Sequence, residues 1–198
     1  NKKLKIHALY KGMIGGSVLV LLTFIFSTRY LGLGLETIQN ALEGEQLPGL
    51  SFILKMIFTS ITLNFGGSGG IVTPIFFVGA ASGNLFGHFL GLDSKIFAAI
   101  GMVSLLAGAA NTPISASIMA IELFGPQVAP YASVACIISF LMTGHRSVYP
   151  SQILSIRKSS SIGVDKGKVM EDIVNVDVQL RDKSIIGGIA KGLKKLKK

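Results

Sequence analysis

A series of apolar segments runs along the chain between residues 12 and 143, and short irregular stretches separate them. The segments are Gly12–Phe26, Leu50–Leu63, Ile71–Leu92, Ile96–Ala110, Ile114–Phe124 and Val128–Thr143. Several are shorter than the roughly 20 residues that a straight membrane-spanning helix needs, and Gly, Pro and Asn interrupt them. Broken backbone is tolerated in a membrane only where it lies within protein or lines a cavity. The pattern therefore predicts an all-α membrane fold of tilted, broken helices, as in transporters with discontinuous helices.

Composition and charge favour the same class of protein. The 198-residue chain is 49% hydrophobic and 15% charged, whereas soluble domains carry about 25% charged residues. The basic residues that produce the net charge of +9 are concentrated in residues 1–11 and 151–198. Because they flank an apolar interior, we prefer the positive-inside interpretation to nucleic-acid binding. It predicts a multi-pass protein of the cell membrane with both ends cytoplasmic, where basic residues meet anionic lipid headgroups.

After Arg157 the composition of the chain changes from mainly apolar to polar and basic. We expect residues 1–157 to form the transmembrane domain and residues 158–198 a basic cytoplasmic tail. Cys136, the only cysteine, excludes an intrachain disulfide, and its apolar surroundings predict a buried thiol. The first residue is Asn1 rather than methionine, so the chain is interpreted as an internal or C-terminal piece of a longer protein.

The sequence "GGSGGIVTP", Gly66–Pro74, places the most irregular backbone between two apolar segments. Glycine lets backbone approach a ligand closely, and Pro74 suits the first turn of a helix that we expect from about Ile71 to Leu90. The first N–H groups of such a helix lack intrahelical partners and carry partial positive charge. The predicted anion donors are Gly70, Ile71 and Val72. A glycine-rich hinge that only permits close packing is an equally open interpretation of this spacing. A soluble phosphate loop is disfavoured, because the Gly-x-x-x-x-Gly-Lys-Ser/Thr motif does not occur.

Three ordered stretches resemble one family. "GGSGGIVTPIFFVGAASGNLFG" resembles the Gly-x-Phe-x-Pro region of the CLC family of chloride channels and chloride/proton antiporters. "AGAANTPISASIMAIELFG", Ala107–Gly125, resembles that family's interrupted helix, and "GHRSVYPSQI", Gly144–Ile153, resembles the segment that holds its pore tyrosine. The match corresponds to the C-terminal half of the family's membrane domain.

The resemblance implies roles for individual residues. The backbone N–H groups of Ile71 and Val72 should donate to a central anion, and the hydroxyl of Tyr149 should donate from the cytoplasmic side. A neutral donor orients an anion without holding it by full charge. Position alone would also suit Tyr149 as an interfacial aromatic anchor. The remaining motif residues are expected to break helices or allow packing: Gly66, Gly67, Gly69, Pro74 and Pro113.

Two departures from the family pattern bear on function. Val72 stands where the motif has phenylalanine, and Thr73 follows it, a Val-Thr-Pro sequence that resembles the fluoride-exporting branch of the family. The gating Gly-Lys/Arg-Glu-Gly-Pro motif of the family's first half does not occur in these residues. By resemblance Glu122 packs at a helix end and does not gate. The identity of the anion and the choice between channel and antiporter therefore stay open.

Other chemistry has little support in the sequence. The three histidines show no metal-ligand spacing, and no nucleophile–base pair stands out, so we expect neither a metal site nor an enzyme. No cofactor is expected beyond chloride as the transported ligand. "GKVMEDIVNVDV", Gly167–Val178, faintly resembles the lead-in to the CBS domains of some family members.

The leading hypothesis is chloride or other anion transport as a CLC-type channel or antiporter. By resemblance the protein is a homodimer, its interface partly supplied by Pro113–Phe124 and Val128–Thr143, and the other half of the pore and membrane lipid are its partners. Nucleic acid is not an expected partner. The alternatives are a truncated membrane scaffold that transports nothing, a fluoride-selective family member, and a soluble phosphate-binding module.

Overall fold

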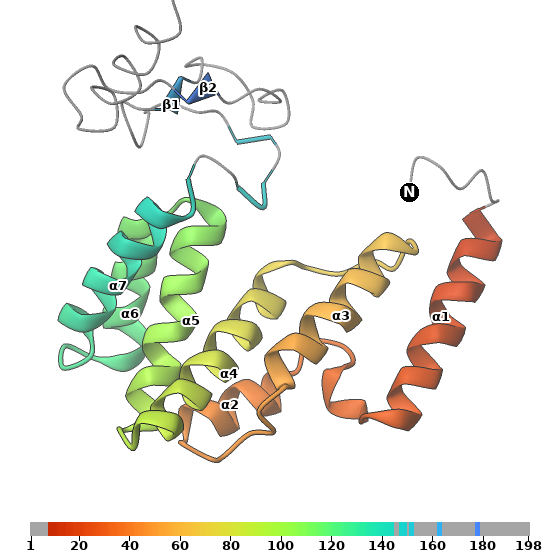
Figure 1. Cartoon of the computed structure of the whole chain (residues 1–198), viewed down its shortest axis with the longest axis horizontal. Helices are drawn as coiled ribbons and strands as arrows, with labels where there is room; N and C mark the ends of the chain where they lie inside the picture. The colour runs from red at the N-terminus through yellow and green to blue at the C-terminus, as the bar shows by residue number, and fades with distance from the viewer. Residues whose placement is uncertain (1–7, 145–146, 150, 153–161, 164–176, 179–198) are drawn as a thin grey trace, which may run out of the picture. The chain divides into compact units, whose positions relative to one another are not determined.

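The computed structural model of the chain describes residues 8–144, 147–149, 151–152, 162–163 and 177–178, with no side-chain description for residues 8, 9, 162, 163, 177 and 178. The chain divides into two compact units, Asn1–Met142 and Thr143–Lys198. The described elements of the first unit are all helical, as the apolar segments predict (Figure 1). They are α1 (Ala8–Ile25), the 3-10 helix η1 (Thr28–Tyr30), α2 (Leu35–Leu42), α3 (Ser51–Asn64), α4 (Val72–Leu90), α5 (Ser94–Ala110), α6 (Pro113–Phe124) and α7 (Ala129–Met142).

The pair α4 and α5 forms the most extensive helix contact of the first unit. The two helices meet backbone to backbone, because glycines occupy the contact on both sides. A Cβ atom added to Gly79 would lie 2.5 Å from the carbonyl oxygen of Gly101, and one added to Gly83 would collide with the carbonyl oxygen of Phe97. Small residues permit such close approach of helices. These glycines are therefore required by packing, and they fix α4 against α5.

Helices α6 and α7 lie beside the second half of α5 (Figure 1). The shared core is made mostly of alanine, which again brings the helix axes together. Its buried residues are Val103, Ala107, Ala116, Ala120, Ala132 and Cys136. The thiol of Cys136 is free and buried, which confirms the prediction made for it.

The ends of the helices carry recognisable stop and start residues. Asp93 caps α5, and Ser94 and Lys95 are already helical. Its carboxylate accepts a hydrogen bond from the N–H of Lys95 at 3.0 Å, which satisfies one of the free donors of the first turn. Asn111 takes the left-handed conformation after α5, and Pro113 is the first residue of α6.

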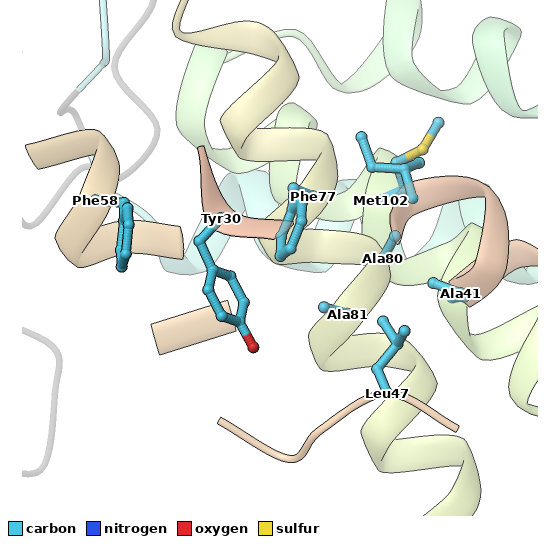
Figure 2. Close-up of a cluster of buried hydrophobic side chains, with 10 residues drawn as sticks. Tyr30, Ala41, Leu47, Phe58, Phe77, Ala80, Ala81 and Met102 are labelled. Carbon is cyan, nitrogen blue, oxygen red and sulfur yellow. The ribbon is translucent and has the colours of Figure 1, made fainter. Parts of the chain in front are cut away.

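The segment between α1 and α3 packs on α3 and α4 through a second core. Figure 2 shows the ring of Tyr30 between those of Phe58 and Phe77, with centroid separations of 5.7 and 6.3 Å. Farther along, the side-chain amide of Asn84 on α4 donates to the carbonyl of Ala41 on α2 at 3.0 Å. An aromatic contact and a buried hydrogen bond therefore hold η1 and α2 against the helices that flank the glycine cluster.

Much of the outer surface of the first unit is apolar. Fully or largely exposed side chains include Phe24, Phe89, Ile114 and Tyr131, whose exposed fractions are 89%, 83%, 76% and 67%. Single exposed apolar residues are ordinary, but a surface with so many of them is typical of a protein covered by lipid or by another chain. Among the described residues, no helix combines the length and the apolarity required to cross a membrane.

The second unit contains two short strands, β1 (Ile162–Gly163) and β2 (Asp177–Val178). They pair antiparallel, with Ile162 opposite Val178. The all-α fold predicted from the sequence does not include this pair of strands. The predicted domain boundary between residues 157 and 158 lies outside the described residues, as does most of the segment Gly167–Val178.

The α4–α5 contact leads to a test of stability. We expect Gly83→Ala to destabilise the protein by about 1–3 kcal/mol, because the new methyl group must displace the backbone of α5. Thermal unfolding of the purified protein in detergent, followed by circular dichroism, measures the change. Gly16→Ala on α1 is the matched control, since no atom lies within 4 Å of the added Cβ. Equal melting temperatures for the two variants would contradict the packing role of Gly83.

Candidate functional site

The connection between α3 and α4 begins with two glycines that serve the backbone. Gly66 has a φ of +93°, a conformation that residues with a Cβ atom rarely adopt. The N–H of Gly67 donates to the carbonyl of Thr62 at 2.8 Å, and a Cβ atom there would lie 2.7 Å from the Thr62 methyl group. Gly66 and Gly67 thus end α3 and turn the chain.

The next two glycines have no such requirement. No atom lies within 4 Å of a Cβ atom added to Gly69 or Gly70, and neither has a positive φ. Both are exposed. Packing and backbone conformation within the described chain therefore do not explain why glycine stands at these two positions, and the backbone there is open to the surroundings.

Helix α4 begins with free backbone donors. Ile71 is its N-cap, with no side-chain capping bond, and the N–H of Ile75 makes the first intrahelical bond, to the carbonyl of Ile71 at 3.2 Å. In the described part of the chain, the N–H groups of Ile71, Val72 and Thr73 have no acceptor, and Pro74 has no N–H. The 19-residue helix adds the partial positive charge of its dipole at this end. The arrangement can bind an anion without a basic side chain.

The start of this helix differs slightly from the sequence-based expectation. Expected donors were Gly70, Ile71 and Val72, whereas Gly70 precedes the N-cap and Thr73 carries a third free N–H. The difference arises because the helix starts at Val72, one residue later than expected. Pro74 consequently occupies the third helical position, where a missing N–H also costs no intrahelical bond.

A cavity of about 150 Å³ lies against the glycine cluster. That volume accommodates several water molecules, since one requires about 10–15 Å³ on such a measure, and it is therefore wide enough for a small hydrated anion. The walls come from three parts of the chain: the end of η1 with the residues after it, the face of α3, and the glycine cluster with the first turn of α4. Its lining residues are Tyr30, Gly32, Leu33, Phe58, Thr59, Thr62, Leu63, Ser68, Gly69, Gly70 and Pro74.

A buried lysine stands behind one wall of this cavity, and sequence reasoning gave it no role. Lys55 on α3 is 1% exposed. Its ammonium donates to the carbonyl of Tyr30 at 3.2 Å and to that of Gly32 at 2.7 Å, and it lies 5.0 Å from the centroid of the Phe77 ring. The sequence did contain a signal for it, since Lys55 is the single charged residue inside the apolar segment Leu50–Leu63. A charged residue within a membrane segment is a default candidate for a functional residue.

Tyr149 belongs to the second structural unit. Its N–H donates to the hydroxyl of Ser147 at 3.1 Å, and its carbonyl accepts from the N–H of Gln152 at 3.1 Å. The side chain is 40% exposed. That Tyr149 shares an anion site with Ile71 and Val72 stays a prediction.

Comparison with known proteins gives one consistent family. The family model described as voltage gated chloride channel matches residues 1–144. A "Chloride/fluoride channel protein" of Pseudomonas syringae pv. tomato is 43% identical over 129 residues, which cover 65% of this chain and 28% of that protein. The "Voltage-gated ClC-type chloride channel ClcB" of Escherichia coli is 32% identical over 161 residues, covering 74% of this chain and 38% of ClcB.

A solved structure shares the fold. The crystal structure of a CLC-type fluoride/proton antiporter superposes with a TM-score of 0.69 at 30% sequence identity, covering 73% of this chain and 37% of that one. The chain spans about a third of the length of the curated relatives it matches.

The two halves of the glycine cluster lead to opposite expectations for stability. Gly66→Ala should destabilise the protein by about 1 kcal/mol or more, because alanine must take a strained positive φ. Gly69→Ala is the matched control. It should change the free energy of unfolding by no more than about 0.5 kcal/mol, as expected away from packed features. Thermal melts in detergent distinguish them. A larger loss for Gly69→Ala than for Gly66→Ala would show that Gly69 is needed for packing.

Proposed function

This chain belongs to the voltage-gated chloride channel family, and from that premise we propose that it forms part of a pathway that carries chloride or a related small anion across a membrane. Proteins of this family are membrane proteins and not enzymes. The observation that carries the proposal is the start of α4, where Ile71, Val72 and Thr73 have free N–H groups and the flanking residues Gly70 and Pro74 line a cavity.

The chemistry of this site suits transport better than tight binding. Backbone N–H groups and a helix dipole attract an anion by partial charges, so the ion can leave as well as enter. We propose that Gly70, Ile71 and Val72 contact the anion and that the Tyr149 hydroxyl donates to it from the cytoplasmic side. The open space around Gly69 and Gly70 supports this assignment, since it leaves the backbone accessible.

Fluoride is the second candidate for the transported anion. Val72 stands where the motif has the larger phenylalanine, and the polar Thr73 follows it, which changes the size and wetting of the site. Two of the similar proteins bear fluoride in their names, a chloride/fluoride channel protein and a fluoride/proton antiporter. Channel and proton-coupled exchange are both compatible with this half of the pathway.

We further propose how the chain is placed in the membrane and that it forms a dimer. Residues 1–157 would lie in the cell membrane and residues 158–198 in the cytoplasm, with both ends of the chain on that side. The exposed apolar side chains of α6 and α7, among them Ile114 and Tyr131, support a homodimer that buries part of these helices. The remaining exposed apolar surface would face lipid.

Ion flux tests the function. Proteoliposomes that contain this chain within its complete reading frame should release chloride or fluoride, and those with residues 1–198 alone should not, because this chain spans only about a third of its relatives. An ion-selective electrode measures efflux of chloride, fluoride and nitrate, with and without a pH gradient. Dependence on the pH gradient indicates an antiporter. No flux from the complete protein would favour a membrane scaffold.

The tyrosine provides a test of the anion site. Tyr149→Phe should raise the half-saturating anion concentration at least about tenfold, since a hydrogen bond to a charged group contributes about 1.5–3 kcal/mol. Tyr10→Phe, at an exposed position on α1, is the matched control and should leave it unchanged.

Crystals of the complete protein grown in bromide provide the structural counterpart of that test. An anomalous peak should lie within hydrogen-bond distance of Ile71, Val72 and Tyr149. If no anomalous peak lies near these three residues, the proposal that they bind the anion is contradicted.

A further inference from the structure

The ammonium of Lys55 is buried among neutral groups. Two carbonyl oxygens accept its hydrogen bonds, from Tyr30 and Gly32, and the ring of Phe77 covers it. Among the residues that the structure describes, it has no carboxylate partner. Carbonyl dipoles and an aromatic face satisfy its donors, but they leave a full positive charge uncompensated.

Such a charge is costly to keep. A buried ion loses its hydration, and protein normally offsets the loss with an opposite charge. The penalty rises in a membrane, where ionisable residues are rare and usually functional. Methionine or leucine would fill the same space on α3 at lower cost. The presence of lysine at this position therefore points to a use for its charge.

The position of Lys55 relates that charge to the cavity at the start of α4. Tyr30 and Gly32, whose carbonyls hold the ammonium, both line the cavity, and so does Thr59, one turn after Lys55 on α3. Gly69, Gly70 and Pro74 line it as well. The ammonium is thus bonded to two residues that line this cavity, and the cavity also borders Gly70 and Pro74, which flank Ile71, Val72 and Thr73 in the sequence.

We propose that Lys55 is the fixed positive charge that draws the transported anion into this cavity and balances it there, without touching it. The inference rests on the proposed function. Because the ammonium is held by Tyr30 and Gly32, it cannot bind the anion directly and trap it, and its field acts through the wall that it stabilises. Lys55 is accordingly a positioning residue that also sets the affinity of the pathway for anions.

Three substitutions separate charge from structure. Lys55→Arg keeps the charge and donors, Lys55→Gln keeps a donor without charge, and Lys55→Met removes both. Each is made in the complete protein and reconstituted for chloride and fluoride efflux. Lys95→Met on the exposed start of α5 is the matched control for loss of one lysine.

The decisive readout is the half-saturating anion concentration, measured separately from maximal flux. A unit charge within about 10 Å of a site, at an effective dielectric constant of about 20, changes the binding of a monovalent ion by about tenfold. We expect Lys55→Gln and Lys55→Met to raise the half-saturating concentration by about that factor. We expect Lys55→Arg and Lys95→Met to leave it within about twofold of the unmodified protein, since both retain the charge behind the cavity.

A purely structural role would move other quantities. If Lys55 had only a structural role, its substitution would lower the melting temperature, and it would lower the maximal flux because fewer molecules fold. The half-saturating anion concentration of the molecules that do fold would stay the same. That result overturns the inference, and so does a tenfold rise for Lys55→Arg. If Lys55→Met gives no monodisperse protein, Lys55→Gln decides the question. Absence of flux from the unmodified complete protein would instead refute the proposed function.

Discussion

The close contact between α4 and α5 is the constraint on which the rest of the first unit depends. With Gly79 and Gly83 against the backbone of Gly101 and Phe97, the two helices can slide or rotate little without a collision of main-chain atoms. Helix α4 is about 28 Å long at 1.5 Å per residue, so a rod fixed along its middle also fixes its first turn. The free N–H groups at its start are positioned from there.

The cavity beside that first turn depends on the packing of a segment distant in sequence. Tyr30 packs between Phe58 and Phe77, and the bonds from Lys55 hold the next carbonyls in place. The site thereby combines partial charges from backbone with one full charge held behind a wall. In the proposed pathway the N–H groups would contact the anion through partial charges, and the full charge would act on it from behind the wall without contact.

Local sequence signals account for most of the fold and only part of the site. The apolar segments mark the helices of the first unit, and the helix expected from about Ile71 to Leu90 runs from Val72 to Leu90. The apolar segment that begins at Ile96 does not show that α5 starts at Ser94, so the capping role of Asp93 follows only from the structure. The grouping of Lys55 with Tyr30 and Gly32 could not be predicted, since those contacts join positions 25 and 23 residues apart. The three motif stretches identified the family, but no local pattern indicates which glycines packing requires and which it does not.

The glycines between α4 and α5 also limit how this protein can change over generations. Every missense substitution that one base change can produce in a glycine codon introduces a Cβ atom: alanine, serine, cysteine, valine, aspartate, glutamate, arginine or tryptophan. At Gly79, Gly83 and Gly101 each of these meets backbone rather than a side chain that could move aside. A lineage therefore has no single-step neutral path away from glycine at these codons. An exchange there requires a compensating shift of the facing helix, so the two helices can diverge only together.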